Sequence, residues 1–313
     1  MSIDFVEALS RDNLTAIKAS PKTDVHCHSF LSTRRENVER WLGYPLTKPP
    51  LKMKGLDGMH AYIDEVLAPH LDHHEGFEFI VASALNDAVQ DGVVILEMSF
   101  DVRLVKFYPD GLTEPCSFIE MLIERYQEQV DLRPELGFAR ECANDPKWMK
   151  SAHEAIELDI FQSIDLYSYE EACAPEAVQS LYAKARAAGM KLKAHVGEFG
   201  GAEEVRRTVE VLDLDEVQHG IAAAESIEVM RWLSEHQIRL NVCPTSNVML
   251  DGVSDLASHP IRTLFDNGVP VTINTDDLMI FGQSVSEEYR NLYRAGVFSA
   301  EELEDIRRAS LAI

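Results

Sequence analysis

Short apolar runs alternate with longer amphipathic stretches along most of this 313-residue chain. Several of the apolar runs lack the alternation of a half-exposed strand, which is typical of strands buried on both faces of a parallel sheet. The stretches between them, such as 202–213 and 224–237, carry apolar residues at helical spacing. The runs that read as strands are 23–29, 92–100, 135–141, 160–168, 191–198, 215–220, 238–246 and 269–277.

Eight strands that alternate with helices predict an α/β fold, the parallel (β/α)8 barrel of the TIM type. We expect residues 1–313 to form a single barrel domain. The stretch 31–91, after the first strand, is too long for a simple connection, and we expect it to add helices that cover the barrel mouth. Because such barrels carry their chemistry at the carboxyl ends of the strands, the polar residues at those ends are the candidates for a site.

Charge and cysteine content narrow the class of protein. The chain has 53 acidic and 29 basic residues and a formal net charge of −24, which disfavours nucleic acid and anionic membrane surfaces as partners. Its five cysteines are scattered without a C-x-x-C pair, which indicates reduced thiols in a cytoplasmic protein. Residues 1–14 have the pattern of an amphipathic helix without a long apolar run, so we expect neither a signal peptide nor a membrane span.

Groups that bind metals and transfer protons stand at the ends of four predicted strands. They are His26 and His28, His195 and Glu198, His219, and Asp276 and Asp277. Such groups are costly to bury unless they are paired or bound to a metal, and the barrel brings the four strand ends to one rim.

Residue chemistry divides this set into ligands and proton carriers. Three imidazoles and a carboxylate form a nitrogen-and-oxygen site that suits Zn²⁺, with iron or manganese as alternatives. The ligands in this interpretation are His26, His28, His195 and Asp276. Glu198 is then a candidate proton donor, and His219 and Asp277 are left to orient and deprotonate an attacking water. The pattern predicts a metal-assisted hydrolase.

Motifs along most of the chain resemble those of the adenosine deaminase family, within the metal-dependent amidohydrolase superfamily. They occur in the order of the family and are HCH (26–28), IDLYSYE (164–170), HVGE (195–198), QHG (218–220), NVCPTSN (241–247) and TINTDD (272–277). The resemblance implies a zinc enzyme that removes the 6-amino group of an adenine-containing small molecule.

The resemblance also implies a role for each residue. One Zn²⁺ per chain would be held by His26, His28, His195 and Asp276. Glu198 would protonate N1 of the purine, and His219 and Asp277 would orient and deprotonate the water that displaces ammonia. Asp165 and Gly197 are candidate substrate-binding residues, although Asp165 could instead orient the loop after its strand.

Two departures from the family pattern fall on substrate recognition. Where the family commonly has an Asp that contacts the sugar, in H-x-H-L-D-G, this chain has Phe30. A phenyl ring cannot accept a hydrogen bond from a ribose hydroxyl, and burying that hydroxyl unpaired costs about 1–3 kcal/mol. Where the family commonly has a glycine after D-L-A, this chain has Ser168 between two tyrosines. Neither departure touches the predicted metal ligands or proton carriers.

The substrate therefore remains open among 6-aminopurines. We expect an adenine nucleoside, adenosine or deoxyadenosine, and keep the 5′-monophosphate and free adenine as alternatives. Arg34 and Arg35 are the candidate ligands of a phosphate, with a solvated basic patch as their alternative. Hydrolysis of an amide, lactone or phosphoester and catalytically silent purine binding are less favoured, because the full set of acid, base and ligand residues is present.

Overall fold

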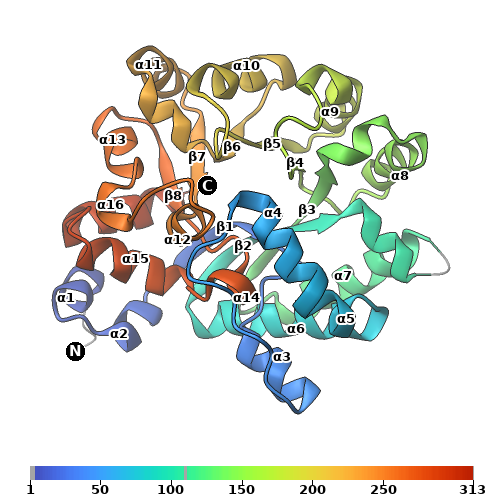
Figure 1. The fold of residues 1–313 in the computed structure, drawn as a ribbon, viewed down its shortest axis with the longest axis horizontal. Coiled ribbons are helices and arrows are strands. Elements are labelled where there is room, and N and C mark those ends of the chain that lie inside the picture. Colours follow the sequence, from blue (N-terminus) through green and yellow to red (C-terminus); the bar gives the residue numbers. More distant parts are fainter. Residues whose placement is uncertain (1–3, 109–110, 313) are drawn as a thin grey trace.

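The computed structural model describes residues 4–108 and 111–312. Eight parallel strands hydrogen-bond to their neighbours in chain order, from β1 to β8, and helices surround them (Figure 1). The strands are β1 (Lys22–His28), β2 (Val93–Asp101), β3 (Asp131–Ala139), β4 (Ser163–Tyr167), β5 (Lys191–Val196), β6 (Glu216–His219), β7 (Arg239–Val242) and β8 (Val271–Ile273). This arrangement confirms the predicted (β/α)8 barrel of the TIM type.

The first and last strands meet through a short seam. An isolated parallel bridge pairs Cys27 with Asp276. The backbone N–H of Asp276 donates to the carbonyl of His26 at 2.9 Å. The side-chain oxygen of Asn274 accepts from the backbone N–H of Val25, also at 2.9 Å. Because this seam includes His26 and Asp276, the contact that closes the barrel also sets two of the predicted metal ligands side by side.

Helices pack around the sheet because each buries one apolar face. In α10, for example, Val205, Val209 and Leu212 are buried. The helices that precede β1 or follow β2 to β8 are α1 (Phe5–Ser10), α2 (Leu14–Lys18), α7 (Thr113–Tyr126), α8 (Pro146–Ile156), α9 (Gln179–Ala187), α10 (Ala202–Leu212), α11 (Ile227–Glu235), α12 (Pro244–Met249), α13 (Ile261–Asp266), α14 (Leu278–Phe281), α15 (Val285–Arg294) and α16 (Ala300–Ser310). No helix within residues 4–108 and 111–312 is both long enough and apolar enough to span a membrane.

The stretch between β1 and β2 is helical. It contains α3 (Arg35–Leu42), α4 (Gly55–Tyr62), a π-helical turn (Ile63–Leu67), α5 (Ala68–Leu71) and α6 (His74–Gln90). A second hydrophobic cluster, separate from the main core, joins these helices to α14 through residues such as Val38, Tyr62 and Phe281. In Figure 1, α4 lies in front of the barrel strands and α3 extends from the edge of the molecule.

A layer of buried ion pairs lies inside the barrel. Lys193 is fully buried, and its Nζ contacts Glu97 and lies 2.7 Å from Glu135. Burial opposes the charge, but the carboxylates of Glu135 and Glu97 raise the pKa of Lys193 above its ordinary value, so the ammonium form is retained. Removing Lys193 would leave the buried carboxylate of Glu135 without a cation, whereas Glu97 would keep Lys191 at 3.3 Å and Arg133 at 3.5 Å.

Replacing Lys193 with methionine tests this layer. The change leaves Glu97 and Glu135 without their central cation, so we expect the free energy of unfolding to fall by about 3–5 kcal/mol in urea titrations. Lys150→Met is the matched control, because Lys150 is 77% exposed and its ion pair with Glu154 lies on the surface. It should change stability by less than about 1 kcal/mol. Equal losses in the two variants would contradict the assignment.

Candidate active site

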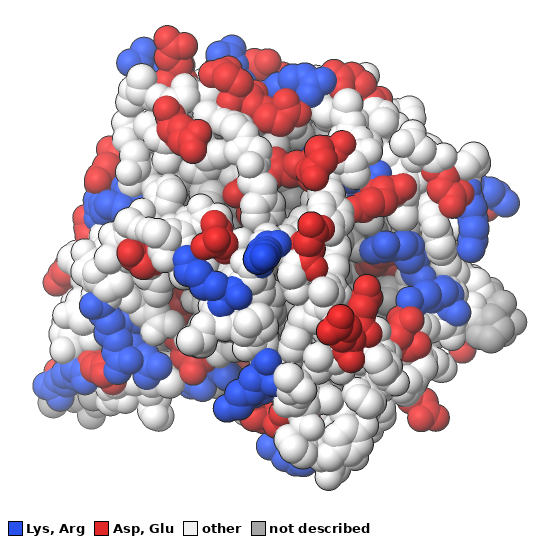
Figure 2. Space-filling view, viewed as in Figure 1, with Lys and Arg blue, Asp and Glu red and all other residues white. Residues whose placement is uncertain are grey.

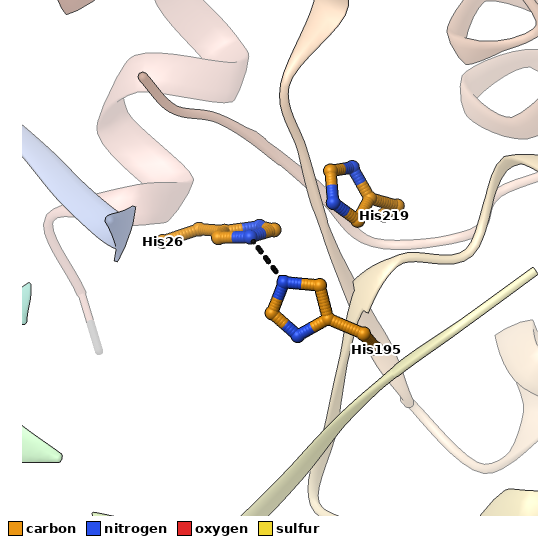
Figure 3. Close-up of side chains that lie close together, drawn as sticks. All are labelled: His26, His195 and His219. Atoms are coloured by element: carbon orange, nitrogen blue, oxygen red, sulfur yellow. Dashed lines mark hydrogen bonds between the residues drawn. The ribbon is translucent and has the colours of Figure 1, made fainter. Parts of the chain in front are cut away.

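The residues predicted as metal ligands lie together where β1, β5 and the segment after β8 meet. Nε2 of His26 lies 3.0 Å from Nε2 of His195. Oδ1 of Asp276 lies 3.4 Å from Nε2 of His28 and 3.9 Å from Nε2 of His26. Figure 3 shows the rings of His26 and His195 with their nitrogens facing one another and His219 beside them. The structure therefore brings the whole predicted ligand set to one place.

Hydrogen bonds on the outer side of the rings fix which nitrogen carries the proton. Nδ1 of His26 lies 2.9 Å from the carbonyl oxygen of Asn241, which can only accept. Nδ1 of His195 lies 3.1 Å from Oδ1 of Asp165, a carboxylate oxygen that accepts in the same way. Both Nδ1 atoms therefore donate, and each Nε2 atom keeps a free lone pair.

Two imidazole lone pairs thus face each other across 3.0 Å. Burial and the neighbouring imidazoles of His219 and His195 hold the pKa of His26 well below its ordinary value, so this ring is neutral. The two facing lone pairs repel each other, and a cation beside the two nitrogens would replace this repulsion with attraction. With the carboxylate of Asp276 next to them, the residues fit a divalent metal of the zinc type.

Asp276, the predicted carboxylate ligand, is held in its charged form. The hydroxyl of Ser246 donates to its Oδ2 at 2.6 Å. Burial opposes ionisation, but the hydrogen bond from His28 and the nearby imidazoles hold the pKa of Asp276 well below its usual range. Cys243 also comes within 4.8 Å of ligand atoms of His26 and Asp276. Because burial raises the pKa of this thiol well above its ordinary value, it is uncharged and a poor ligand.

The three predicted proton carriers lie around this centre. Nε2 of His219 is 3.6 Å from Oε2 of Glu198 and 3.8 Å from Oδ2 of Asp276. Three atoms in this group are buried without a hydrogen-bond partner, namely Oε1 of Glu198, Nε2 of His219 and Oδ1 of Asp277. An unpartnered buried polar atom costs about 1–3 kcal/mol, and such atoms concentrate where a ligand satisfies them.

Their surroundings give the three groups different protonation states. Burial, together with the carboxylates of Asp276 and Glu170, raises the pKa of Glu198 well above its ordinary value, so this group carries a proton. Burial and Asp276 raise the pKa of Asp277 to about 8, and burial lowers the pKa of His219 to about 3. Groups whose pKa values are pushed apart in this way can divide the acid and base roles.

A chain of hydrogen bonds orients His219. The backbone N–H of Ile261 donates to Nδ1 of His259 at 3.1 Å, so Nε2 of His259 carries the proton and donates to Oδ1 of Asn247 at 3.3 Å. Nδ2 of Asn247 then donates to Nδ1 of His219 at 3.1 Å. The proton of neutral His219 is therefore on Nε2, the atom that faces the centre of the site.

A cavity of about 680 Å³ opens onto this centre. Its wall combines His28, Glu198 and Asp277 with Phe30 from the loop after β1 and with residues of α4 such as Met59. Phe30 thus lies at the cavity, where the sequence placed it.

Other predicted substrate residues are not part of the cavity wall. Asp165 is fully buried behind His195 and holds that ring. Gly197 has φ 72°, and a Cβ there would lie 2.3 Å from Cγ2 of Val205, so this glycine is required by the backbone path. Ser168, by contrast, lines the cavity; it has φ 78° and keeps a conformation that favours glycine, although it carries a side chain.

The structure does not bring Arg34 and Arg35 to the cavity. Helix α3 begins at this point, Arg34 pairs with Glu287 at 2.7 Å, and Arg35 lies 3.5 Å from Glu39. The cations that do line the cavity are Arg103, Lys106 and Lys147. Sequence reasoning missed these residues because no motif marks them.

Sequence reasoning also assigned no definite partners to Ser246, Asn247 and Glu170, which hold the reactive side chains in place. Ser246, Asn247 and Glu170 lie inside the motifs NVCPTSN and IDLYSYE, which is a signal of their importance. Their partners, however, lie in distant segments of the chain, and spacing along the sequence does not reveal them. The five cysteines, by contrast, are buried and free, as the sequence predicted.

The fold and the site together define a barrel hydrolase of the metal-dependent amidohydrolase type. The family model for adenosine deaminase matches residues 52–312, and the chain belongs to the adenosine deaminase family. It is therefore a hydrolase of the class that acts on C–N bonds of cyclic amidines.

Individual relatives extend over nearly the whole chain. A putative adenosine/adenine deaminase from Treponema pallidum (strain Nichols) is 38% identical over 289 residues, which cover 92% of this chain and 96% of that protein. The crystal structure of adenine deaminase from Arthrobacter aurescens has a TM-score of 0.79 and 25% identity and covers 94% of this chain and 93% of its own. An amidohydrolase from Burkholderia ambifaria, with bound Zn, shares the fold at a TM-score of 0.78 and 22% identity, with 97% of this chain and 87% of that chain covered.

Asp165→Asn tests the assignment of the outer hydrogen bonds. The amide lacks the charge that fixes the Nδ1 proton of His195, so we expect the affinity for zinc to fall by about 10–100-fold in chelator competition. Asp305→Asn is the control, because Asp305 is an exposed residue on α16. Unchanged zinc affinity in Asp165→Asn would contradict the role of this carboxylate.

Proposed function

We propose that the protein is a zinc-dependent deaminase that hydrolyses the 6-amino group of an adenine nucleoside and releases ammonia. The observation that carries this proposal is the group of three unpartnered polar atoms, on Glu198, His219 and Asp277, around the cation site at the cavity. Glu198 and His219 have the protonation states that their steps require, because the pKa of Glu198 is raised and the proton of neutral His219 is on Nε2.

The ligand set supports one zinc ion per chain. Imidazole nitrogen and carboxylate oxygen are common zinc ligands, and the amidohydrolase of the same fold from Burkholderia ambifaria contains zinc. His26, His28, His195 and Asp276 would hold the ion. When bound, it would supply a Lewis acid that makes water a stronger nucleophile at neutral pH.

The remaining residues divide the proton transfers. Nε2–H of His219 donates a hydrogen bond to the attacking water and orients it toward C6 of the purine. Asp277 in its ionised form accepts a proton from that water, and its raised pKa of about 8 makes this carboxylate a stronger base than an exposed one. Glu198, which is protonated, donates to N1 of the purine and makes C6 more electrophilic. Water oxygen adds to C6, and Asp277 passes the proton that it accepted to the amino nitrogen. The bond from C6 to that nitrogen breaks, ammonia leaves, and the remaining hydroxyl proton returns to Glu198.

The cavity supports a nucleoside as substrate. A volume of about 680 Å³ lies in the range that holds drug-sized ligands, which leaves room for a sugar beside the base. Ser29 and Ser99 line the cavity with Phe30, and their hydroxyls are candidate partners for the sugar.

Helix α4, from the stretch 31–91, contributes to the same wall, and we propose that this stretch covers the mouth of a single barrel domain.

Two of the three cations that line the cavity are paired with carboxylates, which disfavours a 5′-monophosphate, whereas Lys147 lies over the ring of Trp148. Arg103 is paired with Asp101 at 2.7 Å, and Lys106 is paired with Asp72 at 2.6 Å. A phosphate would have to compete with these carboxylates for its contacts. Figure 2 shows acidic and basic side chains interspersed over this face of the molecule, without a continuous basic surface that would attract a nucleotide or a nucleic acid.

Free adenine is the second candidate substrate. The relative from Treponema pallidum is named a putative adenosine/adenine deaminase, and the solved structure from Arthrobacter aurescens is an adenine deaminase. Phe30, in place of a carboxylate that would accept from a sugar hydroxyl, fits a substrate with fewer hydroxyls.

Buried, free cysteines are typical of a reducing compartment, and we propose that the enzyme acts in the cytoplasm.

Glu198→Gln tests the acid role. The amide has the shape of the acid but cannot transfer a proton to N1, so we expect kcat for ammonia release to fall by about 10²–10⁴-fold. The zinc content should stay at that of the wild-type protein, since Glu198 is not in the proposed ligand set. Glu203→Gln, at an exposed position on α10, is the matched control. Ammonia release at the wild-type rate from Glu198→Gln would exclude the proposed chemistry.

A panel of adenine, adenosine, deoxyadenosine, AMP and dAMP tests the substrate. We expect kcat/KM, followed by the loss of adenine absorbance, to be highest for the nucleosides and at least about tenfold lower for the monophosphates. Phe30→Asp should raise the ratio of adenosine to deoxyadenosine turnover, because the new carboxylate can accept from the additional hydroxyl. A preference for the monophosphates would contradict the nucleoside proposal, and a preference for adenine would select the second candidate.

A further inference from the structure

We propose that Glu170 is a positioning residue that holds the loop Gly197–Gly200 and thereby sets the place of Glu198 beside the substrate. The inference rests on the proposed role of Glu198 as the acid. Glu170 follows the end of β4 and is not part of the cavity wall, so it does not touch the substrate itself.

The carboxylate of Glu170 accepts four consecutive backbone N–H groups. Its Oε2 accepts from Gly197 at 2.8 Å. Its Oε1 accepts from Glu198 at 3.0 Å, Phe199 at 2.8 Å and Gly200 at 3.2 Å. Successive N–H groups that converge on one anion form a concave site for negative charge, and hydrogen bonds to a carboxylate are about twice as strong as neutral ones. The loop after β5 is therefore built around a side chain from the loop after β4.

The sequence of the loop fits this contact. A Cβ at Gly200 would lie 2.6 Å from Oε2 of Glu170, so the carboxylate can approach only because this residue is glycine. At the other end, Gly197 has φ 72°, which a residue with a side chain rarely adopts. A Cβ at the next residue, Gly201, meets nothing within 4 Å. The requirement for glycine thus coincides with the contact to Glu170.

Glu198 depends on its backbone for its position. Within the described part of the chain its side chain makes no hydrogen bond, and Oε2 lies 3.6 Å from Nε2 of His219. The contacts that fix its backbone include the N–H donated to Glu170 and those of its two neighbours. The negative charge of Glu170 also contributes to the raised pKa of Glu198, after burial and Asp276. The same carboxylate therefore favours both the place and the protonated state of the acid.

Two variants disturb the contact from opposite sides. Glu170→Gln replaces one accepting oxygen with an NH₂ group that faces N–H donors, and Gly200→Ala places a methyl group against Oε2. We expect kcat to fall by roughly 100-fold in Glu170→Gln, with unchanged KM, zinc content and thermal unfolding midpoint, because a small misplacement of a reacting group has an effect of this size. Gly200→Ala should lower kcat in the same way, and the double variant should be no worse than Glu170→Gln, since both changes break one contact.

Matched controls and a rescue distinguish positioning from general stability. Glu171→Gln changes the neighbouring exposed glutamate, and Gly201→Ala adds a methyl group in open space. Both should keep the wild-type kcat. Glu170→Asp, which retains the charge, should recover part of the activity lost in Glu170→Gln.

Glu198→Gln, assayed alongside, separates failure of this inference from failure of the proposed function. If Glu198→Gln is inactive while Glu170→Gln and Gly200→Ala keep the wild-type kcat, the positioning role is wrong and the acid role stands. If Glu170→Gln loses zinc or its thermal stability together with activity, Glu170 has a general structural role and the inference is equally overturned. If Glu198→Gln is fully active, the proposed function fails and the positioning of an acid fails with it.

Discussion

The site depends on the two lone pairs that His26 and His195 direct at each other across 3.0 Å. Neither ring is free to relieve this repulsion, because its Nδ1 proton is committed to Asn241 or to Asp165. The outer hydrogen bonds thus convert two ordinary histidines into a pair that requires a cation. The carboxylate of Asp276 adds a buried negative charge beside the two rings, because its pKa is held low, and this charge also favours a cation.

The barrel brings these three side chains together. Parallel strands in chain order bring residues separated by 169 positions, such as His26 and His195, to one rim. The seam between β1 and the segment after β8 places Asp276 beside them through its own backbone. Inside the same barrel, Lys193 and its carboxylates form a second set of buried charges. The loops after β4 and β5 add Glu198, the proposed acid, and the carboxylate of Glu170 that accepts from its backbone.

Sequence reasoning predicted the barrel and the ligand set because both follow from local patterns. Apolar runs marked all eight strands, and an H-x-H pair on a strand must share a face. The ends of the strands were less predictable. The apolar run 238–246 continues past β7 into α12, because Pro244 can begin a helix as well as follow a strand. Arg34 pairs with Glu287 instead of facing the cavity, and Glu170 accepts four N–H groups from another loop. Both contacts join residues far apart in the chain, which no local pattern encodes.

The central claim is that the two facing Nε2 atoms share a cation. Anomalous diffraction at the zinc absorption edge, on crystals of the protein as purified with zinc, tests it directly. We predict one peak per chain, with Nε2 of His26 and of His195 each at about 2.0–2.1 Å from the ion. A fully active protein without this peak, or an ion bound only to other residues, would contradict the account.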